Sequence, residues 1–239
     1  LIFKIMEETE DNQNIIKKIA SYIDHTLLKN DVSEEEIKKA CSDAIKYDFK
    51  TICIMPKYIP LAVRLLKDHK TIPITVVDFP LGSSSPIQKA LEAKNSIISG
   101  AKEIDMVIDY KAIIAKDYKT AFEGIKAVVA AASPFPVKVI IETSELSYEE
   151  KIISCALAKA ANAKFVKTST GFSKKGATKE DVALMKRIIG NDMYVKASGG
   201  IKSIEDALIM IKAGASRIGT SSSIKIIEEA YKINSKKNN

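Results

Sequence analysis

Residues Gly100 to Asp109 read GAKEIDMVID, and this stretch contains the structural step that the chain repeats. The glycine follows a helical pattern and favours the left-handed turn that ends a helix. The residues after it form a short, nearly continuous apolar run, which is typical of a parallel strand covered on both faces. The same step recurs in NAKF (162–165) and GASRI (214–218). Each copy predicts one helix–turn–strand unit.

Eight such strands are predicted along the chain, at 22–26, 51–55, 74–79, 103–109, 137–143, 164–170, 193–198 and 216–220. Between them lie amphipathic helical patterns at 31–47, 87–98, 118–131, 148–161, 178–189 and 204–211, the first opened by a capping box of Ser33 and Glu36. This alternation predicts a (β/α)8 TIM barrel of the α/β class, as a single domain over 1–239. An extra helix at 12–21 is expected to cap the barrel floor, and a C-terminal helix and tail are expected at about 221–239. A doubly wound open sheet is disfavoured because its GxGxxG fingerprint is missing.

Composition limits the classes of function. The net charge is +7, but the lysines are spread over every predicted helix, so a nucleic-acid partner is not expected. No apolar run is long enough for a membrane span. The odd number of widely separated cysteines, Cys41, Cys53 and Cys155, favours reduced thiols and a cytoplasmic location. With only His25 and His69, a histidine-rich zinc site is disfavoured and no metal is expected.

Two lysines stand inside predicted strands, Lys167 in FVKTSTGF (165–172) and Lys196 in YVKASGG (194–200). Side chains alternate along a strand and neighbouring strands lie about 4.8 Å apart, so two inward lysines would be close together. Two ammonium groups in one cavity do not both keep their protons cheaply, and the pKa of one is expected to fall. A neutral lysine amine attacks carbonyl carbon to form a Schiff base, but the residues alone leave open which lysine attacks. The alternative is that the lysines extend outward between helices.

Schiff-base chemistry also moves protons, and the strand at 103–109 offers acids of one parity in Glu103, Asp105 and Asp109. Asp105 has the most apolar neighbours. A carboxylate pointing into a barrel beside two lysines would be paired, which offsets the cost of its burial. We therefore expect Asp105 to act in the proton relay, with a purely structural ion pair as the alternative. Lys138 and Glu142 have matching parity in the next strand and either extend this network or only stabilise it.

Polar, glycine-containing segments follow the last three strands: TSTGF (168–172), SGGI (198–201) and IGTSSS (218–223). Glycine lets a ligand approach the backbone closely, and helix N-termini attract anions. Loops after the seventh and eighth strands are a frequent phosphate site in this barrel. The substrate is therefore expected to carry a phosphate a short sugar chain away from its carbonyl.

A series of motifs resembles the deoxyribose-phosphate aldolase family. In chain order they are IDHTLLK (23–29), FPLGSS (79–84), EIDMVI (103–108), VKVIIET (137–143), FVKTSTGF, VKASGGI (195–201) and RIGTSS (217–222). The resemblance implies a class I aldolase, a carbon–carbon lyase that needs no metal or other cofactor. It would cleave 2-deoxy-D-ribose 5-phosphate reversibly to acetaldehyde and D-glyceraldehyde 3-phosphate in deoxynucleoside breakdown. Its partners would be small phosphorylated sugars and aldehydes, and a homodimer or homotetramer stays open.

The resemblance also implies roles for individual residues. Lys167, in the KTSTG motif, would form the Schiff base; Lys196, in KASGG, would lower its pKa and take part in proton transfer; Asp105 would relay protons with water. The residues expected around the substrate and its phosphate are Asp24, Thr26, Thr170, Gly171, Gly199, Gly200, Gly219, Ser221 and Ser222.

Three positions depart from the pattern of many bacterial members: Asp78 replaces glycine, and Asp109 and Met55 replace asparagine. All three lie near predicted strand ends, so the departures are expected to affect the polarity of the pocket mouth and the range of substrates. The rival hypotheses are another Schiff-base barrel enzyme, such as a transaldolase or keto-acid aldolase, and a basic nucleic-acid-binding module.

Overall fold

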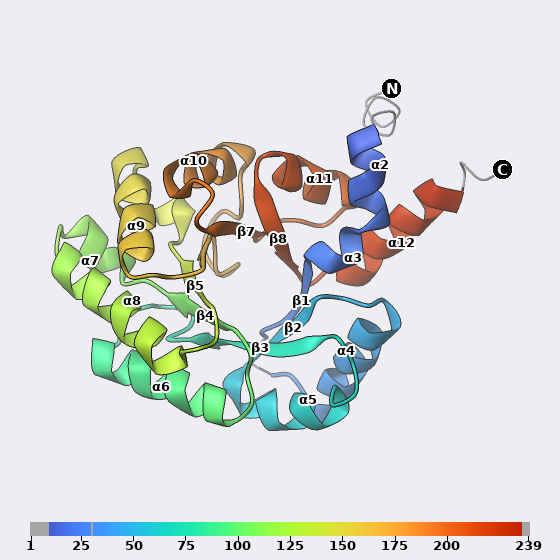
Figure 1. Cartoon of the computed structure of the whole chain (residues 1–239), viewed down its shortest axis with the longest axis horizontal. Helices are drawn as coiled ribbons and strands as arrows, with labels where there is room; N and C mark the ends of the chain where they lie inside the picture. The colour runs from blue at the N-terminus through green and yellow to red at the C-terminus, as the bar shows by residue number, and fades with distance from the viewer. Residues whose placement is uncertain (1–9, 30, 236–239) are drawn as a thin grey trace.

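Eight parallel strands close into a barrel in the computed structural model, which describes residues 10–29 and 31–235. Each strand pairs with its neighbours in chain order, and β1 closes against β8 (Figure 1). The strands are β1 Ile23–Leu27, β2 Thr51–Ile54, β3 Ile72–Val77, β4 Ile104–Val107, β5 Val137–Ile140, β6 Phe165–Lys167, β7 Tyr194–Ser198 and β8 Ala215–Thr220. The predicted TIM barrel is therefore confirmed.

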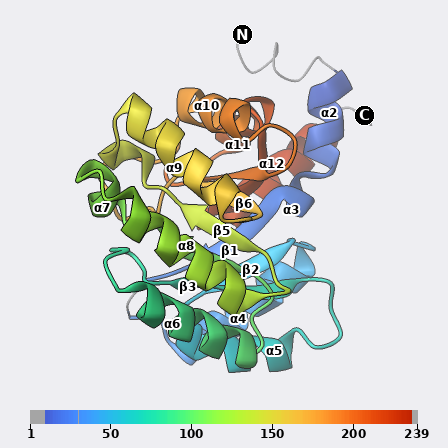
Figure 2. The same ribbon diagram turned by 60° about the vertical axis from the view of Figure 1, so that its left-hand side comes forward.

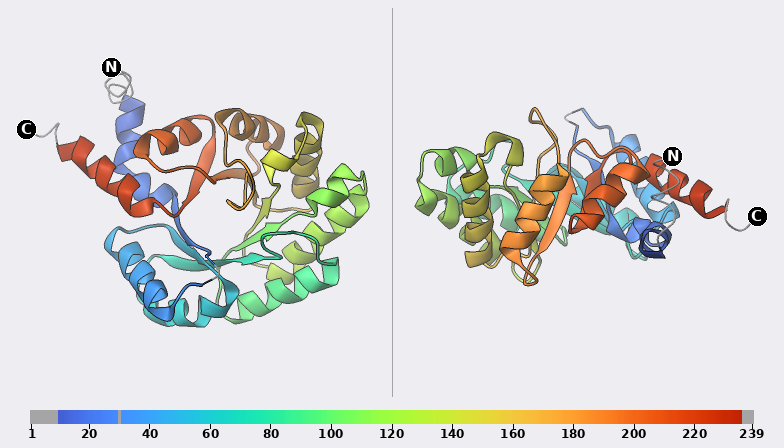
Figure 3. Two further views of the ribbon diagram at one scale, coloured as in Figure 1. Left: turned by 180° about the vertical axis from the view of Figure 1, so that it is seen from behind. Right: turned by 90° about the horizontal axis from the view of Figure 1, so that it is seen from above.

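The helices form the outer layer around this barrel (Figures 1 and 3). They are α4 Glu34–Lys46, α5 Ile59–Leu65, α6 Pro86–Ile98, α7 Tyr110–Ile114, α8 Tyr118–Ala132, α9 Tyr148–Ala160, α10 Lys179–Ile189, α11 Ile204–Lys212 and α12 Ser223–Ser235, with short 3₁₀ turns η1 Pro56–Tyr58 and η2 Thr143–Glu145. On one side α8 lies between α6 and α9 (Figure 2). Sequence patterns did not predict α5 and α7, which are too short to show a helical period.

Helix starts follow their sequence signals closely. Ser33 and Glu36 form the predicted capping box at the start of α4, and serines begin α6, α9 and α11 with the same reciprocal bonds. Several strands end earlier than predicted; β4 stops at Val107 and β6 at Lys167. Beyond those points the polar residues bond to neighbouring loops, so they form the rim of the barrel.

The extra N-terminal helix is present in two parts, α2 Glu10–Lys17 and α3 Ile19–Tyr22. We expected this helix to lie across the barrel floor, but it does not. Both parts pack beside α12, α2 also contacts α11, and α3 contacts β8 (Figures 1 and 3). The apolar residues of this segment, Ile15, Ile16 and Ile19, are buried. Their apolar stripe therefore packs against neighbouring helices and not against the end of the barrel. The C-terminal helix occupies Ser223–Ser235, and residues 236–239 of the predicted tail lie outside the described part.

Side-chain alternation separates two environments. Outward strand residues such as Ile52, Met106, Val139 and Val195 pack against the helices in the main apolar core. The inward residues form a different interior: β2 and β3 contribute a small apolar cluster, together with Leu28, whereas the other strands point mostly charged side chains inward. The apolar cluster comprises Leu28, Cys53, Ile74 and Val76. Packing that stabilises the barrel is therefore separate from the groups available for chemistry.

Cys41, Cys53 and Cys155 are buried and free of disulfides. Burial raises the pKa of the Cys53 thiol to about 11, so this thiol is neutral inside the barrel. Within residues 10–29 and 31–235, no helix has the length and apolar character needed to span a bilayer.

Candidate active site

A cavity of about 340 Å³ opens at the C-terminal ends of β1, β6, β7 and β8. This is the end of the barrel at which active sites of this fold lie. Its walls come from the four loops that follow these strands: Thr26 to Lys29, Lys167 and Thr170 to Phe172, Ser198 to Lys202, and Gly219 to Ser222.

The two predicted lysines meet below this cavity. Lys167 and Lys196 are paired in the register of β6 with β7, so their side chains leave the same face of the sheet. Their Nζ atoms donate to the same oxygen of Asp105, Lys167 at 2.9 Å and Lys196 at 2.8 Å. The outward alternative is therefore wrong for both lysines. Only Lys167 also reaches the cavity; Lys196 is fully buried beneath it.

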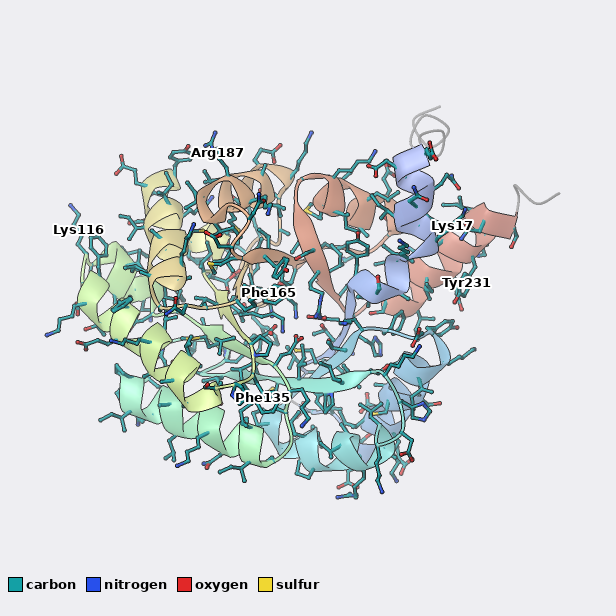
Figure 4. The ribbon with its side chains drawn as sticks, in the orientation of Figure 1. Lys17, Lys116, Phe135, Phe165, Arg187 and Tyr231 are labelled. Carbon is teal, nitrogen blue, oxygen red and sulfur yellow. The ribbon has the colours of Figure 1, made fainter. Side chains whose placement is uncertain are left out.

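The cluster is larger than the sequence indicated. Lys138 donates to the second oxygen of Asp105 at 2.9 Å and also pairs with Glu103. Asp24 pairs with Lys196, and the Arg217 guanidinium joins Asp24 to Glu103, at 2.6 and 3.1 Å. Phe165 lies alongside, pointing toward the middle of the barrel with Lys138 and Arg217 over its ring (Figure 4).

Four cations and three carboxylates therefore share one buried layer. The cations are Lys138, Lys167, Lys196 and Arg217, and the carboxylates are Asp24, Glu103 and Asp105. With every group ionised, this layer has one positive charge too many. Loss of a single proton from one lysine would balance it.

The charged groups of the buried layer differ in the direction in which their pKa values are shifted. Burial alone would raise the pKa of Asp105, but Lys138, Lys167 and Lys196 together hold it well below its usual value. Burial alone would lower the pKa of Lys196, but Asp105 and Asp24 raise it far above its usual value. Asp24 is likewise lowered, against the effect of burial, chiefly by Lys196. At neutral pH Asp24 and Asp105 are therefore anions and Lys196 is a cation.

Of the predicted substrate-binding residues, all but one line the cavity: Thr26, Thr170, Gly171, Gly199, Gly200, Gly219, Ser221 and Ser222. The exception is Asp24, which differs from our expectation. It shares a strand face with Thr26 but lies one step closer to the barrel floor, where it is fully buried between Lys196 and Arg217. Asp24 thus belongs to the charged layer and not to the cavity wall.

Gly219 has a steric role beside the lysines. A Cβ at this position would lie 2.8 Å from Cε of Lys196, too close for any ordinary contact. The absent side chain leaves the room that Lys196 needs to reach Asp105. Gly199 and Gly200 instead have positive φ values of +87° and +79°, which turn the chain sharply after β7 and bring its backbone to the cavity.

Sequence reasoning missed two cations at the cavity, Lys29 and Lys202. Lys29 is the last residue of the IDHTLLK motif and Lys202 directly follows SGGI, so their place in or beside these motifs was the available signal. It also missed Arg217, whose inward parity in β8 matches that of Gly219. Lys138 extends the charged network, which was one of the two roles that we expected for it. Glu142 does not bond to the network. Glu142 accepts bonds from Thr170 and Ser173 and holds the loop after β6.

The three departures from the bacterial pattern do not line this cavity. Asp109 caps α7 by accepting from the Ala112 N–H at 2.9 Å. Met55 packs against the apolar cluster of the barrel interior. Asp78 pairs with the buried Lys89. The expected effect on pocket polarity is therefore not supported by their positions.

Histidine does not enter the site. His25 points away from the barrel interior and packs on the Phe49 ring, and burial lowers its pKa to about 4. Within the described part of the chain, no group of three or more His, Cys, Asp or Glu side chains is arranged to hold a metal ion. The three carboxylates of the charged layer are instead bound by lysine and arginine.

The TIM barrel thus places buried lysines and a carboxylate below a cavity at the C-terminal ends of its strands, which is where enzymes of this fold have their active sites. Residues 18–228 match the DeoC/LacD family aldolase model, and the chain belongs to this family. It is therefore of the aldolase class of lyases.

Relatives named deoxyribose-phosphate aldolase support the family assignment. One from Caldicellulosiruptor saccharolyticus is 49% identical over 216 residues, covering 89% of this chain and 98% of the relative. One from Clostridium perfringens is 51% identical over 213 residues, covering 89% and 95%. A crystal structure of a putative deoxyribose-phosphate aldolase from Coccidioides immitis has a TM-score of 0.89 at 41% identity, covering 90% of this chain and 87% of that one. A tetrameric deoxyribose phosphate aldolase from Aeropyrum pernix has a TM-score of 0.84 at 30% identity, covering 92% and 95%.

Proposed function

We propose that this protein cleaves 2-deoxy-D-ribose 5-phosphate reversibly to acetaldehyde and D-glyceraldehyde 3-phosphate, through a Schiff base on Lys167. The observation that carries the proposal is the contrast between the two lysines. Lys167 reaches the cavity, whereas its neighbour Lys196 is sealed below and held as a cation by Asp24 and Asp105. The names of the relatives support the choice of substrate.

Charge balance supports Lys167 as the nucleophile. An attacking amine must first lose its proton, and the charged layer holds one cation more than it holds carboxylates. Lys196 and Lys138 are both raised in pKa by carboxylates, so they retain their protons. The Lys167 amine donates to a single carboxylate oxygen, that of Asp105, and it shares this oxygen with Lys196. Release of its proton therefore removes the excess charge at the one lysine of this layer that lines the cavity.

The reaction then follows from the chemistry of an imine. The Lys167 amine adds to the C1 aldehyde of the sugar and loses water, giving a protonated imine that can accept the electron pair of the C2–C3 bond. That bond breaks as the C3 hydroxyl loses its proton, releasing glyceraldehyde 3-phosphate and leaving an enamine. Protonation of the enamine carbon and hydrolysis release acetaldehyde. Asp105, anionic and bonded to both lysines, is positioned to pass protons through water between Lys167 and Lys196.

Part of the cavity lining suits a phosphate. The lining includes the backbone turn at Gly199 and Gly200 and the residues Ser221 and Ser222, which directly precede the start of α12 at Ser223. A helix N-terminus and free backbone N–H groups favour an anion, and the two missed lysines, Lys29 and Lys202, add positive charge. The buried free thiols support a reducing compartment such as the cytoplasm.

The decisive test traps the intermediate. Borohydride with 2-deoxyribose 5-phosphate, or with acetaldehyde, should leave a two-carbon adduct on Lys167, located by peptide mass spectrometry. Lys164→Ala, which changes an exposed lysine just before β6, is the matched control and should be trapped as efficiently as the wild type. An adduct of a different carbon number would favour a transaldolase or keto-acid aldolase. Labelling elsewhere, or none, would refute the proposal.

The phosphate assignment predicts a selective loss. Lys29→Ala combined with Lys202→Ala should raise KM for 2-deoxyribose 5-phosphate roughly 10- to 100-fold, because two charged contacts to the anion disappear. KM for unphosphorylated 2-deoxyribose should change less than about 2-fold, since that substrate never makes those contacts. Steady-state kinetics with both sugars compare the two effects directly. An equal loss for both sugars would place the phosphate elsewhere.

A further inference from the structure

A fourth buried lysine, Lys89, lies outside the charged layer. Lys89, on α6, uses all three of its ammonium hydrogens: Nζ lies 2.8 Å from the Gly82 carbonyl oxygen, 3.0 Å from that of Val107 and 3.3 Å from the Asp78 carboxylate. Its stem passes beside Gly124 on α8, where a Cβ would be 3.6 Å from Cδ of Lys89, an ordinary packing distance. One side chain therefore joins α6, the loop after β3 and the end of β4.

Asp78 completes this connection from the other side. Its carboxylate accepts from the N–H and the hydroxyl of Ser84, both at 2.8 Å, and its own N–H donates to Glu92 at 2.9 Å. These bonds close the loop from Asp78 to Ser84. Asp78 has a φ of +52°, a left-handed conformation that glycine adopts at no steric cost. An aspartate here accepts that strain and supplies the carboxylate that faces Lys89.

The closed loop holds an aromatic ring next to the cavity. Phe79, the residue after Asp78, meets Phe172 edge to face, with ring centroids 5.3 Å apart at 88°. Phe172 lines the cavity, and Phe79 also packs on the apolar cluster of the barrel interior. Phe79 thus joins the apolar half of the interior to the cavity wall.

We propose that Asp78 and Lys89 form a clamp that positions Phe79 against Phe172 and so shapes the cavity for its small aldehyde substrate, an inference that rests on the proposed function for the identity of that substrate. Both are positioning residues, because they act only through the loop. Without the clamp, Phe79 loses its fixed place, the Phe172 wall loosens, and binding weakens. The chemistry at Lys167 is unchanged because none of its partners moves.

The absence of tryptophan from the chain allows a direct measurement of loop order. Leu81→Trp, at a position that is 60% exposed within the loop, gives a single fluorescent reporter. In this background Lys89→Met should roughly double the amplitude of the fast anisotropy decay, which reports nanosecond loop motion. Asp78→Gly should do the same, and it keeps the backbone angle without strain, so it decides the question if Lys89→Met fails to fold. Lys94→Met changes an exposed lysine on the same helix and should leave the decay unchanged.

Kinetics separate positioning from simple destabilisation. Lys89→Met and Asp78→Gly should raise KM for 2-deoxyribose 5-phosphate roughly 5-fold, the scale of one lost aromatic contact, with kcat within about 2-fold of wild type. A merely unstable protein would lose kcat in proportion to its folded fraction at constant KM. Unchanged anisotropy in the folded Asp78→Gly variant, or a loss of kcat alone, would overturn the clamp. If the parent protein does not cleave this sugar, the proposed function fails, while the anisotropy still decides whether the clamp exists.

Discussion

Lys167→Met is expected to lower aldol cleavage by roughly 10⁴-fold or more, because the variant has no amine with which to form the imine. No other lysine of the charged layer can replace it, because Lys138 and Lys196 are fully buried and lie outside the cavity wall. Borohydride trapping should be lost together with turnover. Methionine retains the length and most of the volume of the lysine stem, so the neighbouring side chains keep their packing.

The same variant should not be less stable than the wild type. Removal of one partner from a buried ion pair usually destabilises a protein by about 3–5 kcal/mol, because it leaves an uncompensated charge. Here Asp105 retains Lys138 and Lys196, and the layer loses its one excess cation. We expect the free energy of unfolding to stay within about 1 kcal/mol of wild type, or to rise. Urea denaturation at pH 7 measures this.

Two results would contradict this prediction. Turnover within 100-fold of wild type would require a different nucleophile. A large loss of stability would mean that the protonated lysine contributes to folding, and the charge-balance argument for its reactivity would then be wrong. Lys164→Met serves as the control for both measurements, since Lys164 is exposed and lies outside the charged layer.

The barrel was predictable because each of its strands is a short apolar run between strong helix signals. The pairing of Lys167 with Lys196 and Asp105 was also predictable, because parity and strand order suffice to place side chains on one face of a closed barrel. The alternation of side chains along one strand does not show how deep in the barrel each inward side chain lies. The family resemblance placed Asp24 beside Thr26 around the substrate, without showing that Asp24 lies one layer lower, among cations.

Contacts between distant loops were beyond sequence reasoning for a related reason. Asp78 read as a pocket-mouth substitution because nothing in its neighbourhood identifies Lys89 as its partner; that partner is set by the packing of α6 on α8. Arg217 likewise reads as an ordinary basic residue in GASRI until β8 closes against β1. The total charge of the layer can therefore be counted only from the three-dimensional structure. The structure shows a network of seven charged groups in place of a pair of lysines.

Lys196→Met, unlike Lys167→Met, should lose stability as well as activity. We expect the free energy of unfolding at pH 7 to fall by about 3–5 kcal/mol, because Asp24 and Asp105 both lose a buried partner. Lys196 has a raised pKa in the folded state, so its contribution to stability is present below 10.5, its unfolded value, and is lost as the pH rises through the folded value. The variant should therefore lack part of the alkaline loss of stability that wild type shows.

Acid should have a stronger effect on this variant. The pKa values of Asp24 and Asp105 are lowered by folding, so their contribution to stability is present above about 3.8 and is lost as the pH falls through their folded values. Without Lys196 the folded pKa of each carboxyl rises toward its ordinary value, which shrinks that contribution at neutral pH. The variant begins with less stability and should unfold at a higher pH. Denaturation curves from about pH 2 to about pH 12, on the order of one measurement per pH unit, test both limbs, because the acid limb lies below 3.8 and the alkaline limb above 10.5.

Activity of Lys196→Met tests why Lys167 reacts. With one cation fewer, the layer balances while Lys167 still holds its proton, so cleavage at pH 7 should fall roughly 100-fold or more and recover in part at alkaline pH. Lys138→Met makes the same change in charge through the other oxygen of Asp105, and its pH–rate profile should move in the same direction by a smaller amount. A shift in Lys196→Met alone would show that adjacency of the two amines, and not the charge of the whole layer, sets the reactivity. Full activity of Lys196→Met at pH 7 would rule out both explanations.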